Sequence, residues 1–87
     1  MSNVTKTLKG RGKTHGEFSI NSQISQDLKA VLKASPNWDT LSPDKKESLE
    51  MMCHKMARIC TGNAEEKDHW HDIAGYSTLS EDRCVSQ

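Results

Sequence analysis

The sequence predicts an all-α fold, a small three-helix up-down bundle with a flexible basic amino-terminal segment, completed by oligomerisation. Three observations lead to this prediction. Apolar residues recur at three- and four-residue spacings in three segments, short links that contain proline or glycine separate these segments, and no segment alternates as a strand does. A chain of 87 residues forms one domain at most. We expect a Gly-rich leader at residues 1–17, a helical domain at 18–80 and a tail at 81–87.

The first predicted helix starts near Phe18. Its apolar residues lie on one face at helical spacing: Ile20, Ile24, Leu28, Val31 and Leu32. Ser19 or Asn21 is a suitable amino-terminal cap. Pro36 ends this helix, because the residue before a proline is driven out of helical geometry.

The second predicted helix has the clearest start in the chain. Ser42 supplies a capping hydroxyl, Pro43 suits the first helical position, and Asp44 complements the helix dipole. The apolar stripe that follows is Leu49, Met52, Cys53, Met56, Ile59 and Cys60. We expect this stripe to fill the core and Gly62 to cap the carboxyl end.

The third predicted helix begins at Asn63 or Ala64. Its apolar positions are Trp70, Ile73, Ala74, Tyr76 and Leu79. At about 100° per residue these positions spread over more than half of the circumference, which is wider than one neighbouring helix requires. A thin three-helix core is marginally stable, so we expect this second face to support a homo-oligomer.

Composition limits the classes of partner and compartment. Twelve basic and twelve acidic residues balance, so bulk charge does not indicate nucleic acid or an anionic membrane as a partner. No apolar run approaches the roughly 20 residues of a membrane helix. Three cysteines without a signal sequence or a disulfide pattern indicate a cytoplasmic protein.

A polar cluster is predicted between the second and third helices. Asp72 falls within the apolar arc, and a buried carboxylate needs a cation or several donors. Lys55 or Arg58, from the same chain or a second subunit, can supply that cation if the helices are antiparallel. The pairing is either an interhelical salt bridge that fixes register or part of a ligand pocket. Gly75, inside the helix, favours a close helix crossing or access for a ligand.

The pocket alternative assigns a role to each neighbouring polar or aromatic residue. Lys55 and Arg58 would bind a phosphate or another anion. Asp68 and Asp72 could hold a divalent metal. An aromatic ring could stack on a base. The candidate aromatic residues are Trp70 and Tyr76.

A glycine-rich basic segment precedes the helical domain, at residues 10–16. Its Gly-Lys-Thr ending is similar to that of a P-loop, but Thr7 stands where a P-loop requires glycine, and no strand precedes it. Two alternatives remain. Backbone amides with Arg11 and Lys13 could fold over a phosphate on binding, or the segment is a disordered basic leader.

Three stretches together resemble a family of small phage and prophage proteins of unknown function, DUF6378. These stretches are residues 11–18, Lys55-Met-Ala-Arg58 with Gly62, and residues 68–76 in the form D-x-W-x-D-I-A-G-Y. The resemblance spans Arg11 to about Arg83. His15 stands where members of the family commonly have tyrosine. The resemblance implies a phage-encoded protein that acts in the bacterial cytoplasm, and it implies no particular activity.

A more distant resemblance is to the all-helical, MazG-like nucleoside triphosphate pyrophosphohydrolases. That family binds magnesium with E-x-x-E on one helix and E-x-x-D on the next, and residues 47–50 and 65–68 match these patterns. Glu47 and Glu50 project away from the predicted apolar stripe, so Asp68 and Asp72 would be better magnesium ligands here.

These observations favour a noncatalytic helical binding protein whose ligand is a nucleotide or another phosphorylated compound. The first alternative is a phage accessory protein that binds and modulates a host protein. The second is a magnesium-dependent pyrophosphohydrolase. No residue is assigned a catalytic role.

Overall fold

The computed structural model describes residues 16–85, and these residues form three α-helices and one short 3-10 turn. The helices are α2 (Phe18–Lys33), α3 (Pro43–Thr61) and α4 (Lys67–Glu81), and the turn is η1 (Trp38–Thr40). The all-α class and the up-down order are therefore confirmed for this range. The sequence predictions for Arg11 and Lys13 lie outside the described residues.

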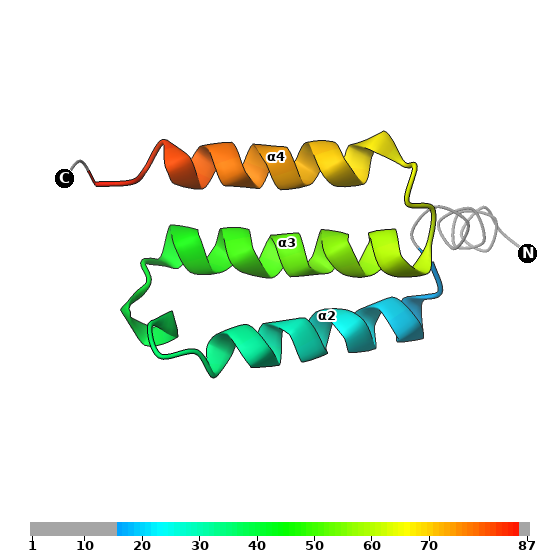
Figure 1. Cartoon of the computed structure of the whole chain (residues 1–87), viewed down its shortest axis with the longest axis horizontal. Helices are drawn as coiled ribbons and strands as arrows, with labels where there is room; N and C mark the ends of the chain where they lie inside the picture. Colours follow the sequence, from blue (N-terminus) through cyan, green and yellow to red (C-terminus); the bar gives the residue numbers. More distant parts are fainter. Residues whose placement is uncertain (1–15, 86–87) are drawn as a thin grey trace, which may run out of the picture.

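The three helices lie side by side in one layer. Consecutive helices run in opposite directions, and α3 lies between α2 and α4 (Figure 1). Each outer helix packs along α3, whereas α2 and α4 scarcely contact each other. This arrangement leaves two broad faces of the layer without a helix packed across them in the described part of the chain.

The helix ends follow from local hydrogen bonding. Glu17 caps α2, because its carboxylate accepts a hydrogen bond from the Ile20 amide at 3.1 Å. The predicted caps Ser19 and Asn21 are therefore wrong, since both lie inside the helix. Helix α3 starts at Pro43 as predicted, but the predicted capping hydroxyl is wrong, because the Ser42 side chain makes no capping hydrogen bond. The carboxyl-terminal cap is Gly62, whose amide donates to the Arg58 carbonyl at 2.8 Å.

Helix α4 begins later than the sequence predicted. The Asn63 side chain accepts from the Glu65 amide at 3.0 Å, and the Asn63 carbonyl accepts from the Glu66 amide at 3.1 Å. These bonds close a turn over residues 63–66, so regular helix starts only at Lys67. None of the described helices combines the length and the apolar character that a membrane crossing requires.

Small and polar side chains, rather than large apolar ones, fill the two helix seams. The buried apolar residues are Trp38, Cys53 and Ala57, and the buried polar residues are Asn21, Ser25, Ser48 and His69. Of the stripe predicted for the second helix, only Cys53 is buried, while Met56 and Cys60 are exposed. The prediction that this stripe fills the core is therefore wrong. The reason is that neighbouring helices approach α3 from two other sides.

Candidate functional site: an open apolar face

Helix α3 shows why its apolar stripe is left uncovered. Ser48 and Lys55 contact α4, whereas Glu50 pairs with Lys33 of α2. Helical positions are about 100° apart, which puts the two contacting sides on nearly opposite flanks of α3. Leu49 and Met56 lie between those flanks. The stripe on α3 therefore points out of the layer.

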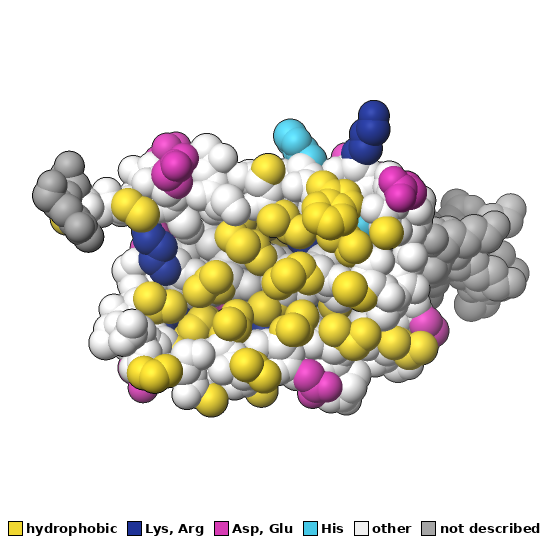
Figure 2. Space-filling view, viewed as in Figure 1, with side chains coloured by type: hydrophobic (Ala, Val, Ile, Leu, Met, Phe, Trp, Pro, Cys, Tyr) yellow, Lys and Arg dark blue, Asp and Glu magenta, His cyan; other side chains and the backbone are white. Residues whose placement is uncertain are grey.

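The outer helices add their own apolar residues to the same face. In α2, buried Ser25 marks the side toward α3, and Ile24 is about 100° away from it. In α4, buried His69 marks the side toward α3, and Trp70 is likewise about 100° away. Figure 2 shows hydrophobic side chains gathered over all three helices on one side of the layer. We call this side the apolar face and define it by Ile20, Ile24, Leu28, Val31, Leu49, Met52, Met56, Cys60, Trp70 and Ile73.

Several members of the apolar face are more exposed than large apolar side chains usually are. The exposed fractions are 69% for Val31, 55% for Trp70 and 40% for Met56. Single exposed apolar residues are normal on protein surfaces, but a contiguous patch across three elements marks an interaction site.

A groove of about 280 Å³ hollows the apolar face between α3 and α4. Its lining residues are Leu41, Lys45, Ser48, Leu49, Met52 and Ser80. Carbon atoms therefore dominate its wall. A groove of this kind suits an apolar side chain better than a charged ligand.

Trp70 stands at the other end of the same seam, because α4 runs antiparallel to α3. Its indole Nε1 donates a hydrogen bond to the Ala64 carbonyl at 2.8 Å. This bond satisfies the polar atom of the ring and restrains its orientation, so the apolar part of the ring is presented to solvent in a defined position.

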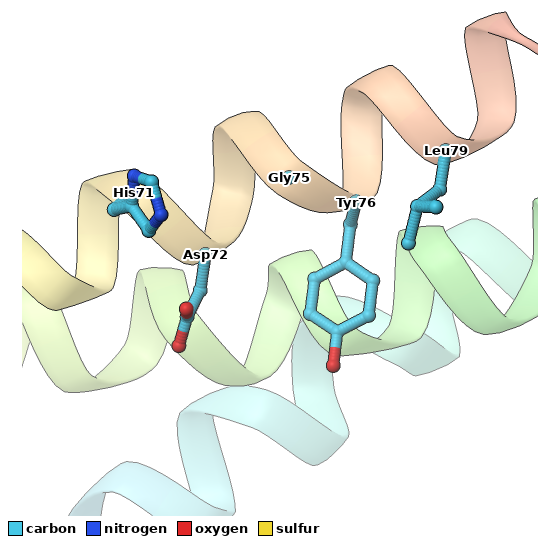
Figure 3. Close-up of a pocket in the computed structure, with 5 residues that line it drawn as sticks. All are labelled: His71, Asp72, Gly75, Tyr76 and Leu79. Carbon is cyan, nitrogen blue, oxygen red and sulfur yellow. The ribbon is translucent and has the colours of Figure 1, made fainter.

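The opposite side of the layer, here called the polar face, carries a second and more open pocket. Figure 3 views this side, since α4 lies above α3 as in Figure 1 but runs in the reverse direction. The pocket residues are His71, Asp72, Gly75, Tyr76 and Leu79. Two of the four candidate ligand-binding residues on α4, Asp72 and Tyr76, therefore lie on the side away from Trp70.

An ion pair between α3 and α4 lies beside this pocket. Lys55 Nζ is 2.8 Å from Asp72 Oδ2, and the Lys55 side chain is only 13% exposed. The hydrogen bond from Lys55 lowers the pKa of Asp72 below its ordinary value. This contact matches the predicted salt-bridge alternative.

Further along the polar face, cations gather around His54 of α3. Burial lowers the pKa of His54, and the charges of Arg58, Lys29 and Lys55 lower it further. Lys29 comes from α2, so this basic cluster of four residues spans the α2–α3 seam. An anion placed there would relieve the mutual repulsion of these groups.

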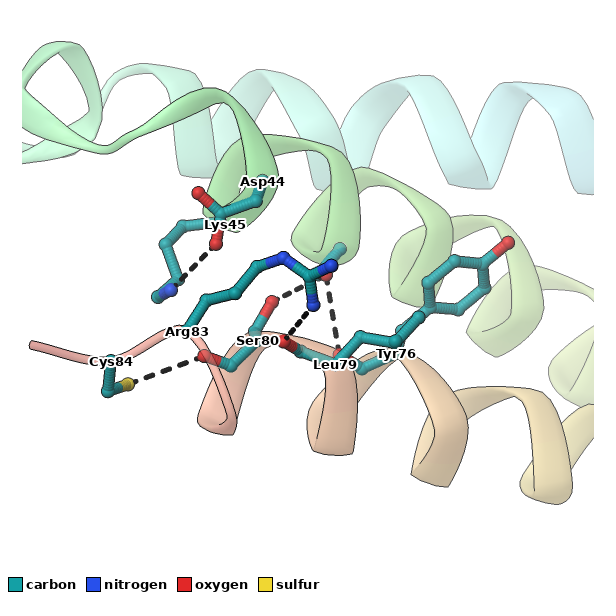
Figure 4. A network of polar contacts seen from close by, with 8 residues as sticks. Asp44, Lys45, Tyr76, Leu79, Ser80, Arg83 and Cys84 are labelled. Carbon is teal, nitrogen blue, oxygen red and sulfur yellow. Dashed lines mark hydrogen bonds and ion pairs between the residues drawn. The ribbon is translucent and has the colours of Figure 1, made fainter.

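At the end of the α3–α4 seam where α3 begins, hydroxyl groups join α3 to α4 (Figure 4). Ser80 Oγ donates to Ser48 Oγ at 2.6 Å, and Ser48 Oγ donates to the Tyr76 carbonyl at 3.4 Å. Lys45 pairs with Asp44 at 2.7 Å, and this contact lowers the pKa of Asp44 to about 2. The serine chain fixes a close approach of the two helices.

The candidate binding residues thus divide between the two faces. Lys55 and Asp72 meet, Arg58 lies one turn from Lys55, and Tyr76 borders the pocket of Asp72. Trp70 lies on the apolar face and is not brought together with them. Asp68 is exposed in the first turn of α4, and within residues 16–85 no three or more His, Cys, Asp or Glu side chains are grouped as metal ligands.

The two acidic patterns that resemble a MazG-like magnesium site lie far apart. Residues 47–50 occupy the first half of α3, whereas residues 65–68 lie at the start of α4. Because these helices are antiparallel, the two patterns are at opposite ends of the helix pair (Figure 1). Glu50 is also engaged with Lys33 at 3.6 Å.

Sequence reasoning missed the apolar face as a whole and the contribution of Lys29 and His54 to the basic cluster. A signal for the face was present in the small residues. Ser25, Ser48 and Ala57 occur beside the apolar stripes at helical spacing. Small side chains at one flank of a helix permit close packing there, and so indicate that the neighbour lies at that flank and not over the stripe.

Comparison of the chain with family models, with curated proteins and with solved structures finds no match.

Proposed function

We propose that this chain is a noncatalytic protein-interaction module that binds another polypeptide through its apolar face. The observation that carries the proposal is the alignment of three apolar helix stripes on one side of a single layer (Figure 2). Burying a large apolar side chain that is otherwise exposed contributes roughly 1.5 to 3 kcal/mol. Four of the ten members of the apolar face are exposed large apolar side chains, namely Ile20, Val31, Met56 and Trp70, so the face has a strong tendency to be covered.

Site-specific photo-crosslinking tests this proposal. A benzoylphenylalanine at Met56, on the apolar face, is expected to form covalent adducts with a polypeptide when cells that express the full chain are irradiated. The same amino acid at Leu79 is the matched control, because Leu79 is 51% exposed and borders the pocket on the polar face. Equal labelling from both positions, or no adduct from position 56, contradicts the proposal.

The basic cluster on the polar face favours a second function, the binding of a phosphorylated ligand such as a nucleotide. The positive charges of Lys29, Lys55 and Arg58 all act on the His54 imidazole, and phosphate oxygens suit such cations. Lys55 is also paired with Asp72, so it would be shared between that carboxylate and the ligand. Under the resemblance to DUF6378, either function would operate in the bacterial cytoplasm, and a host protein would be a natural partner for the apolar face.

A titration separates this second function from the first. Nucleoside mono-, di- and triphosphates, each with and without magnesium, are added to the full chain while the thermal midpoint and the His54 imidazole NMR signals are followed. A bound phosphate should raise both the midpoint and the pKa of His54, because the anion stabilises the imidazolium form. An unchanged midpoint and an unchanged His54 titration with every nucleotide would reject it.

A further inference from the structure

We infer that the polypeptide covering the apolar face is a second copy of this chain, in a twofold-symmetric dimer with two helix layers packed face to face. This inference rests on the proposed interaction function and names its partner. Domains are normally built from at least two packed layers around one apolar core. The described residues supply one layer, and an identical layer completes the core.

The exposure of the apolar face agrees with a second layer packed over it. Val31, Trp70 and Met56 are 69%, 55% and 40% exposed. An identical layer would remove these side chains from water on both copies at once.

Charge also favours a second copy. The chain has twelve basic and twelve acidic residues, so two copies carry no net charge that would repel them. Lys45 is the charged residue among those that line the groove, and its ammonium group is paired with Asp44 of the same chain at 2.7 Å. At the centre lie Met52 and Met56, whose flexible side chains adapt readily to a facing surface.

Shape complementarity gives a specific docking arrangement. A twofold axis that lies in the plane between the layers and crosses α3 at right angles exchanges the two ends of the α3–α4 seam. The groove lined by Leu41, Leu49 and Met52 is near one end, and Trp70 is near the other. Trp70 of each copy is thereby carried over the groove of its partner. Such reciprocal contacts are what a twofold interface requires.

Analytical ultracentrifugation of the full chain tests the inference. At about 100 µM the wild type should sediment with twice the 9.8 kDa of one chain. Met56→Glu, on the apolar face, should sediment as a single chain while retaining its helical circular dichroism. The control Leu79→Glu, an exposed apolar residue on the polar face, should remain a dimer. Dissociation by Leu79→Glu but not by Met56→Glu overturns the inference.

Crosslinking between isotope-labelled copies tests the dimer without a charged substitution in the apolar face. Equal amounts of ¹⁴N- and ¹⁵N-labelled chain, each with benzoylphenylalanine at Trp70, should yield mixed-isotope crosslinks to the groove residues. A monomeric wild type without such crosslinks overturns the dimer. In that case, adducts of position 56 with a different polypeptide would preserve the interaction function, and the absence of any adduct would remove both proposals.

Discussion

At the scale of single residues, the Lys55–Asp72 pair decides between two interpretations of the same sequence pattern. The lysine is mostly buried and lies 2.8 Å from the carboxylate. A cation held in this way has less capacity for a ligand phosphate, so the structure favours the role of an interhelical tie. The pair fixes the register of α4 on α3.

Asp72→Asn should lower the thermal midpoint at pH 7. The folded-state pKa of Asp72 is depressed by Lys55, so its stabilising effect is present above the ordinary pKa of 3.8 and is lost as the pH falls through the folded-state pKa. The midpoints of wild type and variant should therefore converge below about pH 4. Circular dichroism melts at several pH values measure this, with exposed Asp39→Asn as the control. A variant as stable as wild type at pH 7 would show that the pair stabilises nothing.

Gly75 is a residue at which the sequence-based interpretation and the structure differ. The sequence favoured a close helix crossing or ligand access there, but a Cβ built at Gly75 meets nothing within 4 Å. The predicted close crossing is therefore wrong, since the α3–α4 seam passes along another side of α4. The alternative, access for a ligand, stays a prediction, and Gly75 lines the pocket on the polar face.

Gly75→Ala should raise the free energy of unfolding by about 1 kcal/mol, because alanine is the better helix former and no neighbour is displaced. Gly16→Ala is the contrasting control. Gly16 has a φ of +82°, and its added Cβ would collide with the backbone and side chain of Thr61. That variant should be less stable than wild type. Urea unfolding measures both changes, and a loss of stability in Gly75→Ala would indicate a contact that helix propensity does not explain.

At the scale of elements, the close approach of the helices depends on small side chains in the seams. Ala57 of α3 is 1% exposed, and Ser48 is tied to Tyr76 and Ser80 of α4. Larger side chains at these positions would push neighbouring helices apart. Because these small residues occupy the seams, large apolar residues of each helix lie on the apolar face.

Ala57→Leu should lower the free energy of unfolding by about 1 to 3 kcal/mol, because the seam has no room for a larger side chain. The control is Ala30→Leu, at an exposed position of α2, where a change within about 0.5 kcal/mol is expected. Both are measured by urea unfolding. Equal effects of the two substitutions would mean that the seam around Ala57 is not tightly packed.

At the scale of the whole molecule, the antiparallel layer separates an apolar face from a polar face. The two faces are suited to different partners, a polypeptide on one side and an anion on the other. Binding to one face leaves the other accessible. The two proposed functions are therefore compatible in one molecule.

If two layers pack face to face, folding and association are linked. The thermal midpoint of the wild type should then rise as the protein concentration is increased from about 1 to about 100 µM, because association stabilises the folded form by mass action. Met56→Glu should melt at a midpoint that does not depend on concentration. Differential scanning fluorimetry over this range checks both expectations, and a constant wild-type midpoint argues against linked association.

The sequence by itself determined the helical class, the number of described helices and several of their ends. Periodic apolar residues specify helices, and Pro43 and Gly62 act on the backbone within one turn, so these features need no knowledge of the fold. Pairing of Asp72 with a cation of the preceding helix was also predictable, because antiparallel neighbours bring such positions together. The later start of α4 was not, since the Asn63 turn competes with helix over only a few residues.

Only the tertiary structure decided which side of each helix is covered. Periodicity defines an apolar stripe such as that of Met52 and Met56, but it does not say from which direction a neighbour approaches. The answer depends on packing between distant segments, where buried Ser25, Ser48 and Ala57 allow the closest contacts at the flanks of α3. The same packing separates Trp70 from Asp72, because adjacent sides of one helix become opposite faces of the layer.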